Sequence, residues 1–176
     1  MSGQHNTGAT YAISLSGSTS ITAGTGVTLE SLNNNTGTIA LLSSGGINGG
    51  SGTVLMRAAN YAFGGADRTI TTTGVLTIEP DADENSFASS FDNQYLNPVS
   101  VTGLTLGKSS NASAITLSRA ISLSGPVSIY GGSIDVNANI TANSGNILLD
   151  ADTGSTLNQS STCLLYTSDA ADERSW

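Results

Sequence analysis

The sequence predicts an all-β fold, a β-solenoid in which successive coils of the chain stack on one another. Between Ser113 and Asp152, apolar residues occur in pairs separated by one polar residue, the alternation of a short strand with one buried face. Turn sequences such as Ser-Gly, Gly-Gly and Asn-Ser-Gly separate the pairs. The pairs form two series of three: Ile115/Leu117, Ile121/Leu123 and Val127/Ile129, then Ile134/Val136, Ile140/Ala142 and Ile147/Leu149. The second series follows the first at a nearly constant interval, which predicts about three short strands per coil of about 19–20 residues.

The composition favours the same fold class. Of the 176 residues 21 are glycine and only 10% are charged, whereas charged residues make up about 25% of typical domains. Helices usually carry Glu, Lys and Arg on their outer faces, so a helical fold is disfavoured. Disordered chains lack regularly spaced β-branched pairs, so disorder is disfavoured as well.

The net charge of −8 limits the classes of partner. An acidic surface with few lysines repels phosphate backbones and anionic membranes, so we expect no nucleic-acid partner. No apolar run approaches the about 20 residues of a membrane helix, so we expect no membrane insertion. The first residues, MSGQHNTGATYA, lack the basic and apolar segments of a signal peptide.

Residues 163–176 differ in character from the rest of the chain. The segment CLLYTSDAADE, Cys163–Glu173, resembles the translation of a transposase adapter used in sequencing libraries. We therefore expect a non-native tail and exclude it from fold reasoning. The single cysteine lies in this tail, so the remaining chain relies on repeat stacking rather than on disulfides.

The alternation continues less regularly through residues 11–162, after an irregular start at residues 1–10. Two longer excursions interrupt the coils, at residues 57–68 and 79–98. They hold five of the seven aromatic residues outside the tail: Tyr61, Phe63, Phe87, Phe91 and Tyr95. The spacing of four between the last three predicts a short helix whose aromatic edge plugs the solenoid. An aromatic patch that binds a ligand is the alternative.

The acidic loop Glu79–Asn85 contains the candidate metal ligands Asp81, Asp83 and Glu84. Hard cations such as calcium prefer oxygen ligands, which these side chains supply. The loop lacks the glycine and the distal glutamate of a calcium-binding loop, so a solvated acidic loop is favoured.

The other candidate sites are weaker, and we predict no catalytic residue and no cofactor. Three carboxylates could form a glycosidase or lyase pair, but no Arg or Lys accompanies them: Asp135, Asp150 and Asp152. The single histidine, His5, has no partner for nucleophilic catalysis. The glycine-rich GGINGGSG, within residues 43–52, lacks the Lys-Ser/Thr and the helix of a phosphate-binding loop. Thr69 and Thr71–Thr73 cluster, but no threonine column recurs at the coil period, which disfavours ice binding.

Residues 99–151 resemble the repeats of filamentous-haemagglutinin-type adhesins, and the segment GPVSIYGGSIDVNANI, Gly125–Ile140, carries most of this resemblance. The resemblance implies a right-handed parallel β-helix, a secreted or cell-surface location in bacteria, and a role in adhesion to glycans or proteins of host or neighbouring cells. The amino-terminal secretion domain of these adhesins has no counterpart here. We therefore expect an upstream part beyond this sequence.

These observations predict a non-enzymatic structural segment of a large bacterial adhesin. The alternative is a carbohydrate-binding or polysaccharide-degrading β-helix module, which a cleft lined by carboxylates and basic residues would favour. One coil alone does not bury enough apolar surface to be stable, so we also expect self-association through open solenoid ends.

Overall fold

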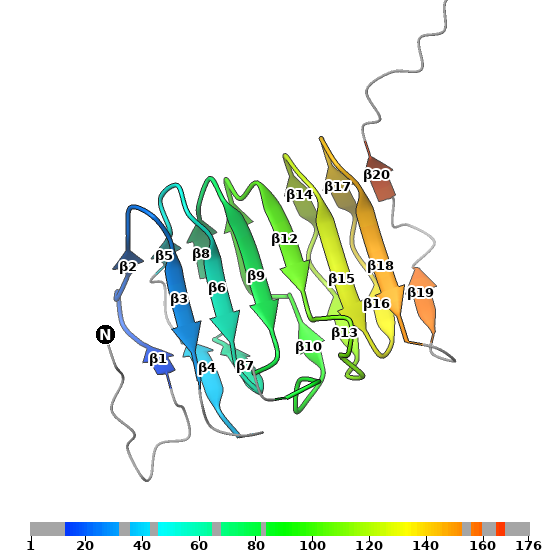
Figure 1. Cartoon of the computed structure of the whole chain (residues 1–176), viewed down its shortest axis with the longest axis horizontal. Coiled ribbons are helices and arrows are strands. Elements are labelled where there is room, and N and C mark those ends of the chain that lie inside the picture. The colour runs from blue at the N-terminus through cyan, green and yellow to red at the C-terminus, as the bar shows by residue number, and fades with distance from the viewer. Residues whose placement is uncertain are drawn as a thin grey trace, which may run out of the picture.

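The computed structural model describes residues 13–31, 36–42, 46–64, 68–81, 84–152, 156–159 and 165–167. These residues form a parallel β-solenoid of six coils with three strands each, followed by two further strands, and contain no helix. The coils wind right-handed from β1 at one end to β18 near the other (Figure 1). The predicted fold class, an all-β solenoid, is confirmed.

The strands stack along three sides of the solenoid, and every pairing between them is parallel. The front side is one six-stranded sheet: β3 (Val27–Glu30), β6 (Val54–Arg57), β9 (Val75–Glu79), β12 (Gly103–Leu106), β15 (Val127–Gly131) and β18 (Ile147–Ala151). The rear side holds two sheets: β2 (Ile21–Thr22), β5 (Ile47–Asn48), β8 (Arg68–Thr71) and β11 (Leu96–Val99), then β14 (Ile121–Leu123), β17 (Ile140–Ala142) and β20 (Leu165–Thr167). The lower side also holds two: β1 (Ile13–Leu15), β4 (Thr38–Leu41) and β7 (Asn60–Phe63), then β10 (Phe91–Asp92), β13 (Ile115–Leu117), β16 (Ile134–Val136) and β19 (Leu157–Gln159).

The predicted register between the fifth and sixth coils is confirmed on all three sides. Ile115 pairs with Ile134 on the lower side, as the repeat period predicts. The equivalent strands also pair as predicted on the rear side, β14 with β17, and on the front side, β15 with β18. Inward side chains therefore form continuous columns, and Ile115 and Ile134 are each fully buried. Each such side chain stabilises the stack by about 1.5–3 kcal/mol through removal of apolar surface from water.

Elsewhere the coils are longer than the predicted period. Along the front side, Val27 pairs with Val54, and Val54 in turn pairs with Leu76. The widest interval of this ladder separates Leu76 from its next partner, Leu104. The extra residues lie between the strands, at the corners of the solenoid. The strand ladder can therefore stay in register while the length of the coil varies.

Both excursions contribute strands to the solenoid. Strand β7 lies within residues 57–68, and strands β10 and β11 lie largely within residues 79–98. The short helix predicted around Phe87 and Phe91 is wrong, because no helix occurs in the described residues 84–152. Phe91 instead pairs with Ile115 in β13, and this ladder overrides the helical spacing of the aromatic residues. The glycine-rich segment within residues 43–52 also contributes a strand, β5.

Residues 1–10 and most of the tail 163–176 lie outside the described residues. In the tail, strand β20 pairs with β17. The division of the chain at residues 10 and 162 stays a prediction.

Candidate functional site

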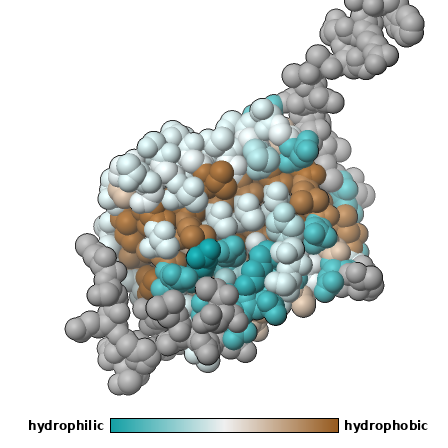
Figure 2. All heavy atoms as spheres, in the orientation of Figure 1, coloured by the Kyte–Doolittle hydropathy of each residue, from teal (hydrophilic) through white to brown (hydrophobic). Residues whose placement is uncertain are grey.

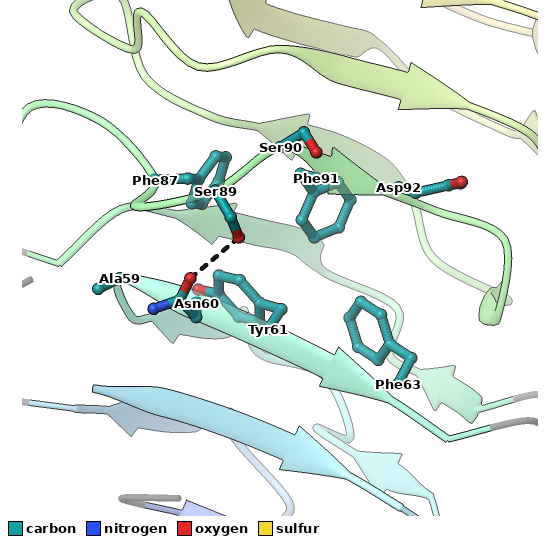
Figure 3. A pocket seen from close by; sticks show the side chains of 9 residues that line it. All are labelled: Ala59, Asn60, Tyr61, Phe63, Phe87, Ser89, Ser90, Phe91 and Asp92. Carbon is teal, nitrogen blue, oxygen red and sulfur yellow. Dashed lines mark hydrogen bonds between the residues drawn. The ribbon is translucent and has the colours of Figure 1, made fainter. Parts of the chain in front are cut away.

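The lower side of the solenoid is interrupted between the third and fourth coils, where no ladder joins β7 to β10 in the described chain. Four aromatic rings fill this break (Figure 3). Phe87 and Phe91 stack with their ring centroids 5.6 Å apart, and Tyr61 meets each of them edge-on at 5.7 Å. Phe63 lies 5.9 Å from Phe91. Phe87 and Phe91 are buried, so the aromatic residues plug the side of the solenoid and hold two coils together where backbone pairing is interrupted.

Tyr61 fixes this aromatic cluster to the neighbouring corner. Its hydroxyl lies 2.8 Å from the carbonyl oxygens of both Met56 and Glu79, to which it donates its proton. Burial raises the pKa of the Tyr61 hydroxyl well above its usual value, because the phenolate would be removed from water. This hydroxyl is hydrogen-bonded and shielded from water, so its role at the break in the lower side is structural.

A small pocket opens at the rim of the aromatic cluster, between β7 and β10. Asn60, Ser89, Ser90 and Asp92 supply its polar lining, and the Ser89 hydroxyl donates to the Asn60 side-chain oxygen at 2.9 Å (Figure 3). The pocket has a volume of about 30 Å³. This volume holds about two water molecules, whereas small-molecule sites usually span about 300–1,000 Å³. The pocket therefore does not enclose a ligand.

The structure places a lysine against the predicted metal loop. The Lys108 ammonium group donates to the backbone carbonyl oxygens of Glu84 and, at 3.3 Å, of Asp81. Asp83 lies outside the described residues, and among those described no group of three or more His, Cys, Asp or Glu side chains could hold a metal ion. The two carbonyl groups are therefore already bound to a positive charge from the chain itself. Metal binding by Asp81, Asp83 and Glu84 stays a prediction.

A ladder of charged residues runs along one border of the front sheet. Arg57 lies between Glu30 and Glu79 in adjacent strands, with nitrogen–oxygen distances of 3.6 and 2.5 Å. The hydrogen bond to Glu79, opposed by some desolvation, raises the pKa of Arg57. This ladder aligns three successive coils at the same corner.

Of the three carboxylates considered as a glycosidase pair, Asp135 lies on a different side of the solenoid from Asp150 and Asp152. Asp135 is on the lower side in β16, where it accepts a hydrogen bond of 2.7 Å from Asn158. Asp150 belongs to the front sheet, beside Tyr130, and Asp152 follows that strand. His5 lies outside the described residues. The pocket at the rim of the aromatic cluster is not lined by any of these three carboxylates.

Sequence reasoning missed a polar column on the lower side. Asp92, Thr116, Asp135 and Asn158 occupy equivalent positions in four successive strands. Asp92 accepts hydrogen bonds from the Ser118 hydroxyl at 3.0 Å and from a backbone amide. Because Asp92 belongs to a two-residue strand inside the second excursion, the alternating pattern carried no signal for it.

Sequence reasoning also missed a column on the front side, which we call the threonine rank. Its members point away from the core at one register position of the six-stranded sheet: Thr28, Leu55, Thr77, Thr105, Ser128 and Leu148. The interval between neighbouring members varies from coil to coil, so a search at one fixed period could not find the rank. By contrast, Thr72 in the predicted threonine cluster is buried, and its hydroxyl donates to the carbonyl oxygen of Gly50 at 3.2 Å.

Comparison of the chain with protein-family models, curated proteins and solved structures found no match. Among the described residues, no helix is long and apolar enough to cross a membrane. The fold and its outward columns define the chain as a β-solenoid repeat protein.

Proposed function

We propose that this chain is a structural, non-enzymatic segment of a large secreted or surface-exposed bacterial adhesin of the filamentous-haemagglutinin type. The observation that carries this proposal is the stack of six coils joined by an unbroken front sheet. At about 4.8 Å per coil, six coils form a stiff shaft about 25–30 Å long. A shaft of this kind holds a binding region away from the cell, and its own side chains make weak, repeated contacts with glycans or proteins of host or neighbouring cells.

The acidic surface and the small pocket support this proposal over a catalytic function. Glu30, Glu79 and Asp135 interact with side chains of adjacent strands. The pocket at the break in the lower side has room for about two water molecules. Acidic side chains that interact between strands and a pocket too small for a substrate are typical of a solvent-exposed structural surface.

A carbohydrate-binding or polysaccharide-degrading module is the second candidate. The polar column of Asp92, Thr116, Asp135 and Asn158 favours it, because these hydrogen-bonding groups recur at the spacing of the coils. A glycan chain lying along the solenoid axis would meet them in turn.

One set of measurements separates the two functions. The purified chain is presented to a glycan array and to soluble polysaccharides, beside Asp92→Asn and Asp135→Asn variants. A shaft is expected to release no reducing ends and to bind cells only when many copies coat one bead. Release of oligosaccharides, lost in either variant, would refute the shaft and support the enzyme. Tight binding of one glycan by single copies would support a carbohydrate-binding module instead.

We also propose self-association through the solenoid ends. In the described chain, β3 and β18 each pair on one side only, so each offers an edge of backbone donors and acceptors. Sedimentation velocity is expected to show species larger than the monomer that grow with concentration. A monodisperse monomer at all concentrations would contradict this part of the proposal.

A further inference from the structure

The front side differs from the other two sides in its continuity. In the part of the chain that the structure describes, the rear side breaks between β11 and β14 and the lower side between β7 and β10. The front sheet runs through all six coils without interruption (Figure 1). Both excursions leave it intact. It is therefore the longest regular surface of the solenoid.

The threonine rank lies along the middle of this sheet. Neighbouring members are about 4.8 Å apart along the solenoid axis, and the next outward position on each strand lies about 6.6 Å away. That next position is occupied by Gly26, Thr53, Val75, Gly103, Pro126 and Asn146, of which all but the two glycines are exposed. Two adjacent ranks therefore form a rectangular net of hydroxyl and aliphatic groups with one amide, and the two glycines leave positions of this net without a side chain.

These two ranks carry no charged side chain, although the protein has a net charge of −8. The charges of the front sheet gather in the rank on the other side, at Glu30, Arg57, Glu79 and Asp150. Figure 2 shows the same division, with pale and brown residues across the face and hydrophilic residues along its lower part. A charged partner would find no complement on the uncharged net.

The chemistry of the net also disfavours two uncharged partners. A glycan would need hydrogen-bonding groups in succession, as in the polar column of the lower side, whereas aliphatic side chains interrupt the hydroxyl groups of the threonine rank and its neighbour. A second copy packed face to face would need large apolar side chains throughout, as in a β-sandwich. Leu55, Val75 and Leu148 are the large apolar residues in these two ranks of the described sheet.

We propose that the front face binds ice. The prism face of hexagonal ice repeats its oxygen atoms on a rectangular net of similar dimensions. Each threonine offers one hydroxyl that bonds to a lattice water and one methyl group that fits between lattice positions. A single hydrogen bond to ice is no more favourable than one to liquid water. A stiff sheet, however, makes many such contacts at once without a further loss of conformational entropy. This surface binding goes beyond the shaft function and does not depend on it.

The test measures ice recrystallisation, thermal hysteresis and partition of the whole chain into slowly growing ice. Thr105→Lys places a long charged side chain in the threonine rank. The matched control is Thr141→Lys, a half-buried outward threonine on the rear side. Circular dichroism checks that each variant is folded, and Ser128→Lys replaces Thr105→Lys if that variant does not fold.

The proposal expects the unchanged protein and Thr141→Lys to inhibit recrystallisation at the same concentration. Thr105→Lys should need at least tenfold more protein. Three results would overturn the proposal: no inhibition by the unchanged protein, equal loss in both variants, or no effect of either front-face variant. Binding to crystalline cellulose or chitin that Thr105→Lys abolishes, without ice binding, would overturn it in favour of a glycan surface. A dimer lost in Thr105→Lys, again without ice binding, would overturn it in favour of a second copy.

Discussion

Asn111 connects separate coils through its side chain, and replacing it tests the energetics of the stack. Its side-chain oxygen accepts hydrogen bonds of 3.2 Å from the amides of Phe87 and Ser113. Its side-chain nitrogen donates to the carbonyl oxygen of Tyr130 at 2.8 Å and to that of Ser113 at 3.3 Å. Only 3% of Asn111 is exposed. The residue therefore satisfies backbone groups of three chain segments that no strand pairing joins at this corner.

We expect Asn111→Ala to reduce the free energy of unfolding by about 3 kcal/mol. The change leaves the amide of Phe87 and the carbonyl group of Tyr130 without these partners, at about 1–3 kcal/mol for each buried group. The bonds to Ser113, close by in the chain, add less because a local turn can rearrange. Asn137→Ala, at an exposed asparagine, is the control and should change stability by less than about 0.5 kcal/mol.

Equilibrium urea unfolding followed by circular dichroism measures both variants. With a denaturant dependence of about 2 kcal/mol per molar urea, the midpoint of Asn111→Ala should fall by about 1.5 M. Asn111→Asp should be at least as destabilised at pH 7, since a buried carboxylate would face the Tyr130 carbonyl group. Its stability should recover as the pH falls, because the protonated acid can donate again. A midpoint for Asn111→Ala within error of Asn137→Ala would refute this account of the corner.

Three further predictions concern the core and the break in the lower side. Ile134→Ala should lower the free energy of unfolding in urea by about 2–5 kcal/mol because Ile134 is fully buried, whereas Asp135→Ala on the outer face should lower it far less. Equal losses in the two variants would contradict the assignment of Ile134 to the core. The raised pKa of Tyr61 means that its contribution to stability is complete below the phenol's ordinary pKa of about 10 and is lost as the pH rises toward the folded-state value. Tyr61→Phe should therefore lose less stability than the unchanged protein as an alkaline titration passes pH 10, and identical profiles would contradict the burial of the hydroxyl. Gly50 has a φ of 58°, and a Cβ added to it would lie 2.3 Å from the carbonyl oxygen of Gly24, so Gly50→Ala should lower the melting temperature. A Cβ added to Gly24 would meet no atom within 4 Å, so the control Gly24→Ala should change the melting temperature little.

The sequence predicted the fold well where the coil length is constant. Ile115 and Ile134 recur at the predicted period because the fifth and sixth coils turn through short corners, and the hydrophobic pairs reveal the register directly. At the fourth coil this signal is lost, since a much longer stretch of chain separates Leu76 from its partner Leu104. Single-sequence spacing cannot distinguish a long corner from a departure out of the stack. Strands β7, β10 and β11 therefore lie in segments whose spacing predicts excursions.

The candidate sites were harder to predict for the same physical reason. An outward column depends on the register between strands, and neither Thr28 nor Thr77 shows in the sequence which residue lies beside it. Aromatic spacing was equally ambiguous: Phe87 and Phe91 fit one helical edge but pack into the core on either side of a short bend. In both cases tertiary pairing, rather than local preference, decides where the side chain points.

The position of the two breaks links fold and function. The longest interval of the front ladder falls in the fourth coil, where the rear and lower sheets are interrupted. On the lower side, aromatic rings from β7 and β10 replace the missing backbone pairing. The front sheet accepts coils of different lengths without losing its register, because Thr77, Thr105 and Ser128 remain neighbours across the longest coil and the next. A solenoid that needed only to be stiff could tolerate a break on any side. Irregularity confined to two sides therefore indicates that the third is the surface whose geometry matters.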